Sequence, residues 1–194
     1  FQGWFGIGSQ LDGLGHLGGP DGTFYNCNKG KDFAKISGLT KLGIETVPPI
    51  VARGIILDMA EHFGVEYLEA GRSFSVEDVK AVEKKQGTPI KKGDVVIFHT
   101  GWIDAKLDSE PEVWGSGEPG QSPEVAEYLA SKEVVAVGAD NWGLDVIPPK
   151  DMNEAFQGHV ILLKENGIYI LEAMNTGPLV KDKALEFLFV LGHA

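Results

Sequence analysis

Continuous apolar runs separated by turn signals dominate the hydrophobic pattern of this chain. They predict strands at residues 50–58, 95–98, 134–138, 160–163, 168–171 and 187–191. Runs that are apolar throughout, rather than alternating, are typical of a sheet that is covered on both faces. Two helices are predicted between the strands. One begins at the capping-box-like Ser75–Asp78 and ends at Gly87, and the other begins at Ser122 with a proline in its first position. The pattern therefore predicts an α/β fold, a single domain over residues 1–194 with a mixed sheet core flanked by helices.

The dipeptide Asn166–Gly167 lies between two apolar runs and predicts a β-hairpin. In that hairpin His159 lies diagonally across from Glu172 on one face, because side chains alternate with period two. Their other neighbours on this face are apolar. A carboxylate set among them must be paired, protonated or bound to a metal, because an unpaired buried charge is costly. The pattern leaves a structural ion pair and a metal site both open.

The densest set of polar candidates lies in a glycine-rich segment near the start of the chain. Gln10 and Asp12 point to the same side of an extended segment, and His16 follows a glycine-rich turn that can fold back on them. An amide oxygen, a carboxylate and an imidazole could hold a divalent cation, or place a base beside one. An ordinary loop is the alternative, since Asp-Gly is common turn chemistry. The literal G-x-G-x-x-G at 13–18 is followed by Gly-Pro-Asp-Gly, which cannot open the helix that a dinucleotide site needs.

The composition of the chain excludes several classes of binding partner and of metal site. The chain has 28 acidic and 17 basic side chains and a net charge of -11, which argues against nucleic-acid and anionic-membrane partners. No apolar run approaches the roughly 18 residues of a membrane span. The only cysteine, Cys27, excludes an internal disulfide and cysteine-rich zinc sites and suits the cytoplasm; we expect it to be a buried, inert thiol. The start at Phe1 and the apolar run close to Ala194 indicate a chain that is cut at both ends.

Four segments together resemble a known family. Residues 6–16 resemble the signature H-x-G-T-H-x-D-x-P-x-H of the putative cyclase family, which includes bacterial kynurenine formamidase, isatin hydrolase and trans-dienelactone hydrolase-like enzymes. Residues 98–102 resemble the family's R-T-G-W strand end, and 137–145 its G-x-D-x-x-S-x-D segment. Residues 159–172 resemble its H-x-x-L-L-x-x-G-I-x-I-x-E block. The four blocks occur in the family's order and extend over essentially the whole chain.

The resemblance implies a swivelling β/β/α-like fold and a metal-dependent hydrolase, with His16 as the general acid/base. It implies that the metal ligands are Asp12, His159 and Glu172, joined by the carbonyl of Gln10. Gly6 and Gln10 stand where the family has histidines, so one or two ions, manganese or zinc, are compatible with the pattern. The substrate would be a small cyclic or aromatic amide or lactone. The family also implies a homo-oligomer, a dimer or tetramer.

Three further residues are candidates for the substrate pocket, namely Trp102, Trp142 and His99. Core packing is the alternative for the tryptophans, and a satisfied histidine at a strand end is the alternative for His99. Two other functions use the same residues. One is a metal-dependent cyclase or dehydratase acting on a polyketide-like or hydroxy-acid substrate. The other is a non-catalytic relative that binds a small ligand, which the loss of a ligand at Gly6 would favour.

Overall fold

The computed structural model describes residues 8–192. Its central element is one mixed sheet of six strands. The expectations about the chain ends and about Gly6 lie outside the described residues. Across the sheet the order is β1-β11-β10-β8-β6-β12. The bounds are β1 Gln10–Asp12, β6 Ile50–Asp58, β8 Val95–His99, β10 Ala136–Ala139, β11 Tyr169–Glu172 and β12 Glu186–Leu191. The four central strands run parallel, and β1 and β12 are antiparallel edges. The predicted α/β class and mixed sheet are confirmed.

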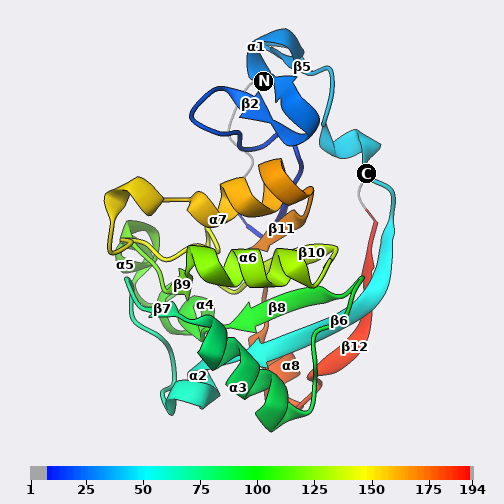
Figure 1. Ribbon diagram of the computed structural model, residues 1–194. Helices are drawn as coiled ribbons and strands as arrows, with labels where there is room; N and C mark the ends of the chain where they lie inside the picture. Colours follow the sequence, from blue (N-terminus) through cyan, green and yellow to red (C-terminus); the bar gives the residue numbers. More distant parts are fainter. Residues whose placement is uncertain (1–7, 193–194) are drawn as a thin grey trace.

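The helices and minor strands lie between and around these strands (Figure 1). The helices are α1 Gly30–Phe33, α2 Met59–Phe63, α3 Val76–Gln86, α4 Trp102–Lys106, α5 Pro111–Ser116, α6 Pro123–Ser131, α7 Gln157–His159 and α8 Gly177–Lys181. Short 3-10 turns occupy Tyr25–Cys27, Ile44–Thr46 and Met152–Glu154, and a π-helix occupies Val160–Glu165. The two-residue strands are β2 Thr23–Phe24, β3 Asn28–Lys29, β4 Ala34–Lys35, β5 Gly38–Leu39, β7 Ser73–Phe74 and β9 Gly120–Gln121. None of the helices formed by residues 8–192 has the length and apolarity that crossing a bilayer requires.

Both faces of the sheet are covered, as its continuous apolar strands predict. On one face Ile55, Val96 and Ile170 pack against buried side chains of α3, α6 and the π-helical segment. On the other face Ile56, Ile97 and other side chains pack with residues of α8 and of the segment before β6. Figure 1 shows α3 and α6 in front of the sheet and the small N-terminal strands above α7.

Local signals account for the two long helices. At the start of α3, Ser75 Oγ accepts from the backbone of Asp78, and the Asp78 carboxylate accepts from the backbone of Ser75, which is a complete capping box. Gly87 ends the helix with φ +69°, a conformation that glycine adopts without strain. Pro123 opens α6 in its first turn. Both helices are confirmed where the sequence predicts them.

The predicted hairpin at Asn166–Gly167 is wrong. Residues 157–165 are helical, and Asn166 caps that helix, with its side-chain amide donating to the Ile161 carbonyl at 2.8 Å. Gly167 follows with φ +66°, as in helix C-terminal motifs. A short apolar run does not distinguish a buried strand from a buried helix. The segment joins β10 to β11, which are parallel, and parallel neighbours require a crossover rather than a hairpin.

The expectation for Cys27 is also wrong. The side chain lies in a 3-10 turn of the small N-terminal unit and is exposed. This unit of two-residue strands has few buried side chains, so Cys27 has no core to enter.

Candidate metal centre and adjoining cavities

Polar side chains gather where the parallel strands end. Asp58, His99 and Glu172 are the last residues of β6, β8 and β11, and Asp140 directly follows β10. All four are buried. Ligand sites of open α/β sheets lie outside the carboxyl ends of the strands, so this edge is where a functional site is expected.

The edge strand β1 adds two side chains to this edge. It pairs antiparallel with β11, with Gln10 opposite Glu172. Because residues two apart share a face, Gln10 and Asp12 both point to the Glu172 side. The Gln10 amide donates a short hydrogen bond to Glu172 Oε2 and lies 3.4 Å from Asp12 Oδ1. The sheet register therefore places the Gln10 amide and the Asp12 carboxylate, from near the start of the chain, beside the Glu172 carboxylate.

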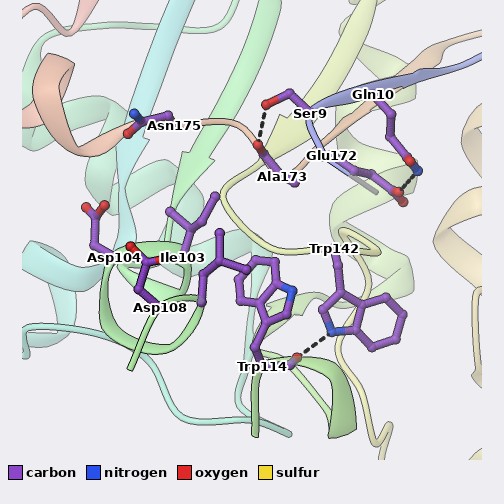
Figure 2. Close-up of a pocket in the computed structure, with 12 residues that line it drawn as sticks. Ser9, Gln10, Ile103, Asp104, Asp108, Trp114, Trp142, Glu172, Ala173 and Asn175 are labelled. Carbon is purple, nitrogen blue, oxygen red and sulfur yellow. Dashed lines mark hydrogen bonds between the residues drawn. The ribbon is translucent and has the colours of Figure 1, made fainter. Parts of the chain in front are cut away.

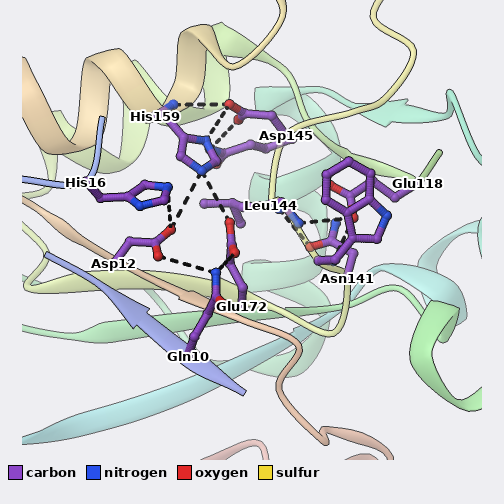
Figure 3. Close-up of polar contacts among 12 residues, drawn as sticks. Gln10, Asp12, His16, Glu118, Asn141, Leu144, Asp145, His159 and Glu172 are labelled. Carbon is purple, nitrogen blue, oxygen red and sulfur yellow. Dashed lines mark hydrogen bonds and ion pairs between the residues drawn. The ribbon is translucent and has the colours of Figure 1, made fainter. Parts of the chain in front are cut away.

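Two histidines complete the cluster (Figure 3). His159, on α7, places Nε2 3.2 Å from Glu172 Oε1 and 3.8 Å from Asp12 Oδ2. His16 places Nε2 3.7 Å from the same Asp12 oxygen, and its side chain is 31% exposed. One ligand atom from each of Asp12, His16 and His159 lies within 4.8 Å of the others. The structure thus brings together all five residues that the sequence singles out for metal and proton chemistry. His159 meets Glu172 from a helix, however, and not across a hairpin.

The donor set fits a divalent cation. Asp12 Oδ2 is buried and has no hydrogen-bond partner, although two imidazole nitrogens face it just beyond hydrogen-bond distance. Burial and the neighbouring Glu172 carboxylate raise the pKa of Asp12 to about 7. A cation among these groups would bind the oxygen that accepts no hydrogen bond and relieve the repulsion between the carboxylates. Mixed imidazole, carboxylate and amide ligands suit manganese or zinc.

Asp145 holds His159 from behind, a role that the sequence did not assign. One oxygen, Oδ2, accepts from the backbone N–H of His159 at 3.1 Å and from its Nδ1 at 3.0 Å. Gln121 donates to the other oxygen at 3.0 Å. Burial alone would lower the pKa of His159, but the bonds to Asp145 and Glu172 outweigh burial and raise it to about 10. The hydrogen bond at Nδ1 leaves Nε2 directed at Asp12 and Glu172, as in carboxylate–histidine–metal arrangements. Asp145 ends one of the family-like blocks, and this position is the signal in the sequence that could have pointed to its role.

Glu118 is a second residue that the sequence analysis missed. Its side chain is fully buried, and Oε2 accepts from the backbone N–H groups of Trp142 and Gly143 at 2.6 and 3.1 Å. Burial raises the pKa of this carboxyl well above its usual range, although the two backbone bonds oppose the shift. Glu118 therefore fixes the loop that connects β10 to Asp145. No sequence spacing links residue 118 to residue 142.

Two cavities adjoin the cluster. The larger, of about 480 Å³, extends from Gln10 and Glu172 to α4 and the Trp114 side chain (Figure 2). The smaller, of about 370 Å³, is lined by residues that include His16, His159 and Phe156. Trp142 and Glu172 line both. A ligand in either cavity would therefore touch the cluster.

The three pocket candidates lie in different environments. Trp142 lines both cavities, and its Nε1 donates to the Trp114 carbonyl at 2.8 Å. Trp102 is 0% exposed and packs near Tyr67, so the structure places it in the core and not in a cavity wall. His99 is buried, with Nδ1 2.7 Å from Thr176 Oγ1 and 3.3 Å from Asp140 Oδ2. Burial would lower the pKa of His99, but Asp140 outweighs it and the pKa is raised. This is the arrangement of a satisfied histidine at a strand end.

Comparisons with known proteins identify a family. The model of the putative cyclase family matches residues 2–146. An isatin hydrolase of Roseibium aggregatum is 31% identical over 93 residues, which are 45% of this chain and 35% of that enzyme.

Solved structures share the fold. A crystal structure of a novel cyclase is similar with a TM-score of 0.83 and 26% identity, over 93% of this chain and 60% of that one. Isatin hydrolase A from Labrenzia aggregata, bound to benzyl benzoate, has a TM-score of 0.60 and 19% identity over 86% of this chain and 59% of its own. The chain thus corresponds to only part of the length of each of these relatives.

Proposed function

The chain belongs to the putative cyclase family, and from this premise we propose that it is a metal-dependent hydrolase. The proposed substrate is a small cyclic or aromatic amide or lactone. The observation that carries the proposal is the convergence of Asp12, His159 and Glu172 beside two cavities, with a buried oxygen on Asp12 that accepts no hydrogen bond. The isatin hydrolase relative, whose name denotes hydrolysis of a cyclic amide, supports the reaction class.

Asp12, His159 and Glu172 would hold the metal, with the Gln10 carbonyl as a further ligand if its side-chain amide turns over. The amide orientation in the structure directs Nε2 at both carboxylates. Manganese and zinc both match these ligands, with one or two ions per chain. Such an ion would lower the pKa of a water molecule to about 7 and polarise a carbonyl group.

His16 is the proposed general acid/base. Its ring lines the smaller cavity, so it can exchange a proton with a reactant there. Its Nε2 also faces Asp12, which places the exchange beside the proposed metal ligands. Burial and the neighbouring His159 lower the pKa of His16, which favours the neutral ring that accepts a proton. Asp145 keeps His159 in one orientation, and Glu118 keeps Trp142 and Gly143 at the cavity wall.

The proposal is tested by hydrolysis assays on isatin and on a panel of small aromatic amides and lactones. Activity should disappear after exhaustive chelation and return with manganese or zinc. Asp12→Ala should lose both metal and turnover, whereas His16→Ala should keep metal and lose turnover. Full activity after chelation would refute the proposal.

A metal-dependent cyclase or dehydratase is the second candidate, because the relative most alike in fold among those compared above is a cyclase by name. The two reactions differ in the fate of water. Hydrolysis in ¹⁸O-water places the label in the product, and ring closure with loss of water does not. Cytoplasmic location and a homo-oligomeric state, a dimer or tetramer, complete the proposal.

A further inference from the structure

The two ends and the wall of the larger cavity are lined by side chains of different chemistry. Gln10 and Glu172 of the metal cluster lie at one end, and Trp114 and Trp142 form an aromatic wall. Asp104 and Asp108 lie at the other end, on α4 and the turn that follows it (Figure 2). A cavity of about 480 Å³ is large enough for a drug-sized aromatic molecule.

The charge along this cavity is of one sign. Among residues 8–192, neither lysine nor arginine lines this cavity or the smaller one. Asp104 and Asp108 are exposed and take part in no ion pair found within residues 8–192. They lie four positions apart, in α4 and in the turn after it, and their like charges repel each other. A bound cation would relieve this repulsion, and a bound anion would add to it.

The neighbouring cations are already committed to other groups. Lys106 donates to Glu110 at 2.6 Å, and its Nζ lies 4.9 Å from the centre of the Tyr67 ring. His99 forms its ion pair with Asp140 and feels the charge of Asp104 only at longer range. Among residues 8–192 both aspartates therefore lack a direct cationic partner and can attract a charged ligand.

The aromatic wall complements a positive ligand. The Trp142 indole is fixed by its hydrogen bond to the Trp114 carbonyl, so its orientation does not have to be set when a ligand binds. Aromatic rings stack on aromatic ligands, and their faces attract cations, tryptophan most strongly.

We propose that the substrate is an aromatic amide or lactone that carries a protonated amine at the end remote from the bond to be cleaved. Asp104 and Asp108 select that amine, and Trp114 and Trp142 bind the ring. The inference rests on the proposed function for the position of the reactive end, while the selection of charge follows from the cavity itself.

The test uses three probes with the same phenyl ring and different charge, namely 2-phenylethylamine, 2-phenylethanol and phenylacetate. Binding is followed by tryptophan fluorescence at pH 7 and low salt. The proteins are wild type, the Asp104→Asn/Asp108→Asn variant, and a control with Asp32→Asn and Asp182→Asn. The two control residues are exposed and do not line the cavity. The control therefore changes the net charge of the protein as much as the cavity variant does, but leaves the cavity unaltered. Circular dichroism verifies that each variant is folded.

The wild type should bind the amine best and phenylacetate worst. Each partly exposed charge pair contributes about two- to fivefold, so the double variant, which removes two, should lose about four- to twenty-fivefold in amine affinity. Its affinity for the alcohol should stay within about twofold, and the control should resemble wild type. The inference is overturned if phenylacetate binds as well as the amine, if the double variant keeps the preference, or if the amine does not bind saturably.

Because binding is measured without turnover, the two proposals fail separately. Loss of the amine preference with intact metal-dependent hydrolysis overturns only the charge selection. An intact amine preference without hydrolysis overturns only the proposed reaction.

Discussion

Asp145 holds His159 through a single carboxylate oxygen, which accepts from the histidine backbone at 3.1 Å and from its ring at 3.0 Å. The two bonds fix both the backbone at the last residue of α7 and the rotation of the imidazole. The ring therefore presents Nε2 to Asp12 and Glu172 without a further adjustment. The candidate metal centre depends on a residue that touches none of its other members.

Asp145→Asn tests this dependence. Asparagine is similar in shape but lacks the charge that holds the Nδ1 proton, so His159 loses its fixed orientation. We expect metal affinity to fall about ten- to hundredfold, as measured by competition with a chromophoric chelator. Asp182→Asn, at an exposed position on α8's C-terminal side, is the matched control and should bind as wild type. Unchanged affinity in Asp145→Asn would show that the carboxylate does not orient the ligand.

Gly158→Ala tests the same contact from the backbone side. A Cβ at Gly158 would overlap Asp145 Oδ1 and lie 2.8 Å from Gln121 Nε2, so Asp145 must move. We expect a loss of about 1–3 kcal/mol in the free energy of unfolding, together with weaker metal binding. Gly115→Ala meets no atom within 4 Å and should be neutral or stabilising. Equal urea midpoints for the two variants would contradict the prediction.

Metal binding should tighten as pH rises. The pKa of Asp12 is raised to about 7 by burial and Glu172, and that of His159 to about 10 by Asp145 and Glu172 against the effect of burial. An ion must displace the proton from each group. Binding should therefore release about two protons below pH 7 and about one between pH 7 and 10. Calorimetry in buffers of different ionisation enthalpy measures this number. Release of no protons at pH 6 would contradict the expected ligands.

Ser75→Ala should destabilise the fold without affecting the site. It removes the side-chain oxygen that accepts from Asp78 at 3.2 Å at the start of α3. The expected loss is about 1 kcal/mol in the free energy of unfolding, measured by urea denaturation, with metal affinity unchanged. Ser37→Ala, in an exposed turn, is the control. A change below that of the control would show that the capping box does not stabilise α3.

The sequence predicted the parts of the fold that depend on local signals. Apolar runs located β6, β8 and β11, and the capping box and proline located α3 and α6. The strand predicted at 160–163 is wrong, because the apolar residues of this segment are buried as completely in a helix as they would be in a strand. Only the parallel pairing of β10 and β11 decides between the two, and pairing is not a local property.

The site residues likewise comprise some that local sequence signals predict and some that they do not. Gln10, Asp12 and His16 could be grouped from spacing within one loop. His159 and Glu172 were grouped by the family-like block and by a hairpin that does not form. The contacts of Glu118 with Trp142 and of Gln121 with Asp145 join segments about two dozen positions apart, and no periodicity reports them. Whether Trp102 or Trp142 faces a cavity depends on how the loops beyond the strands pack, which only the structure shows.

The number of divalent ions bound per chain tests the central claim most directly. Wild type, Asp12→Ala, Glu172→Ala and His16→Ala are dialysed to equilibrium with manganese or zinc, and metal is counted by elemental analysis after circular dichroism has verified folding. The account predicts at least one ion per chain in wild type and His16→Ala, and none in Asp12→Ala or Glu172→Ala. Equal metal content in wild type and Asp12→Ala, or no metal in wild type, would contradict it.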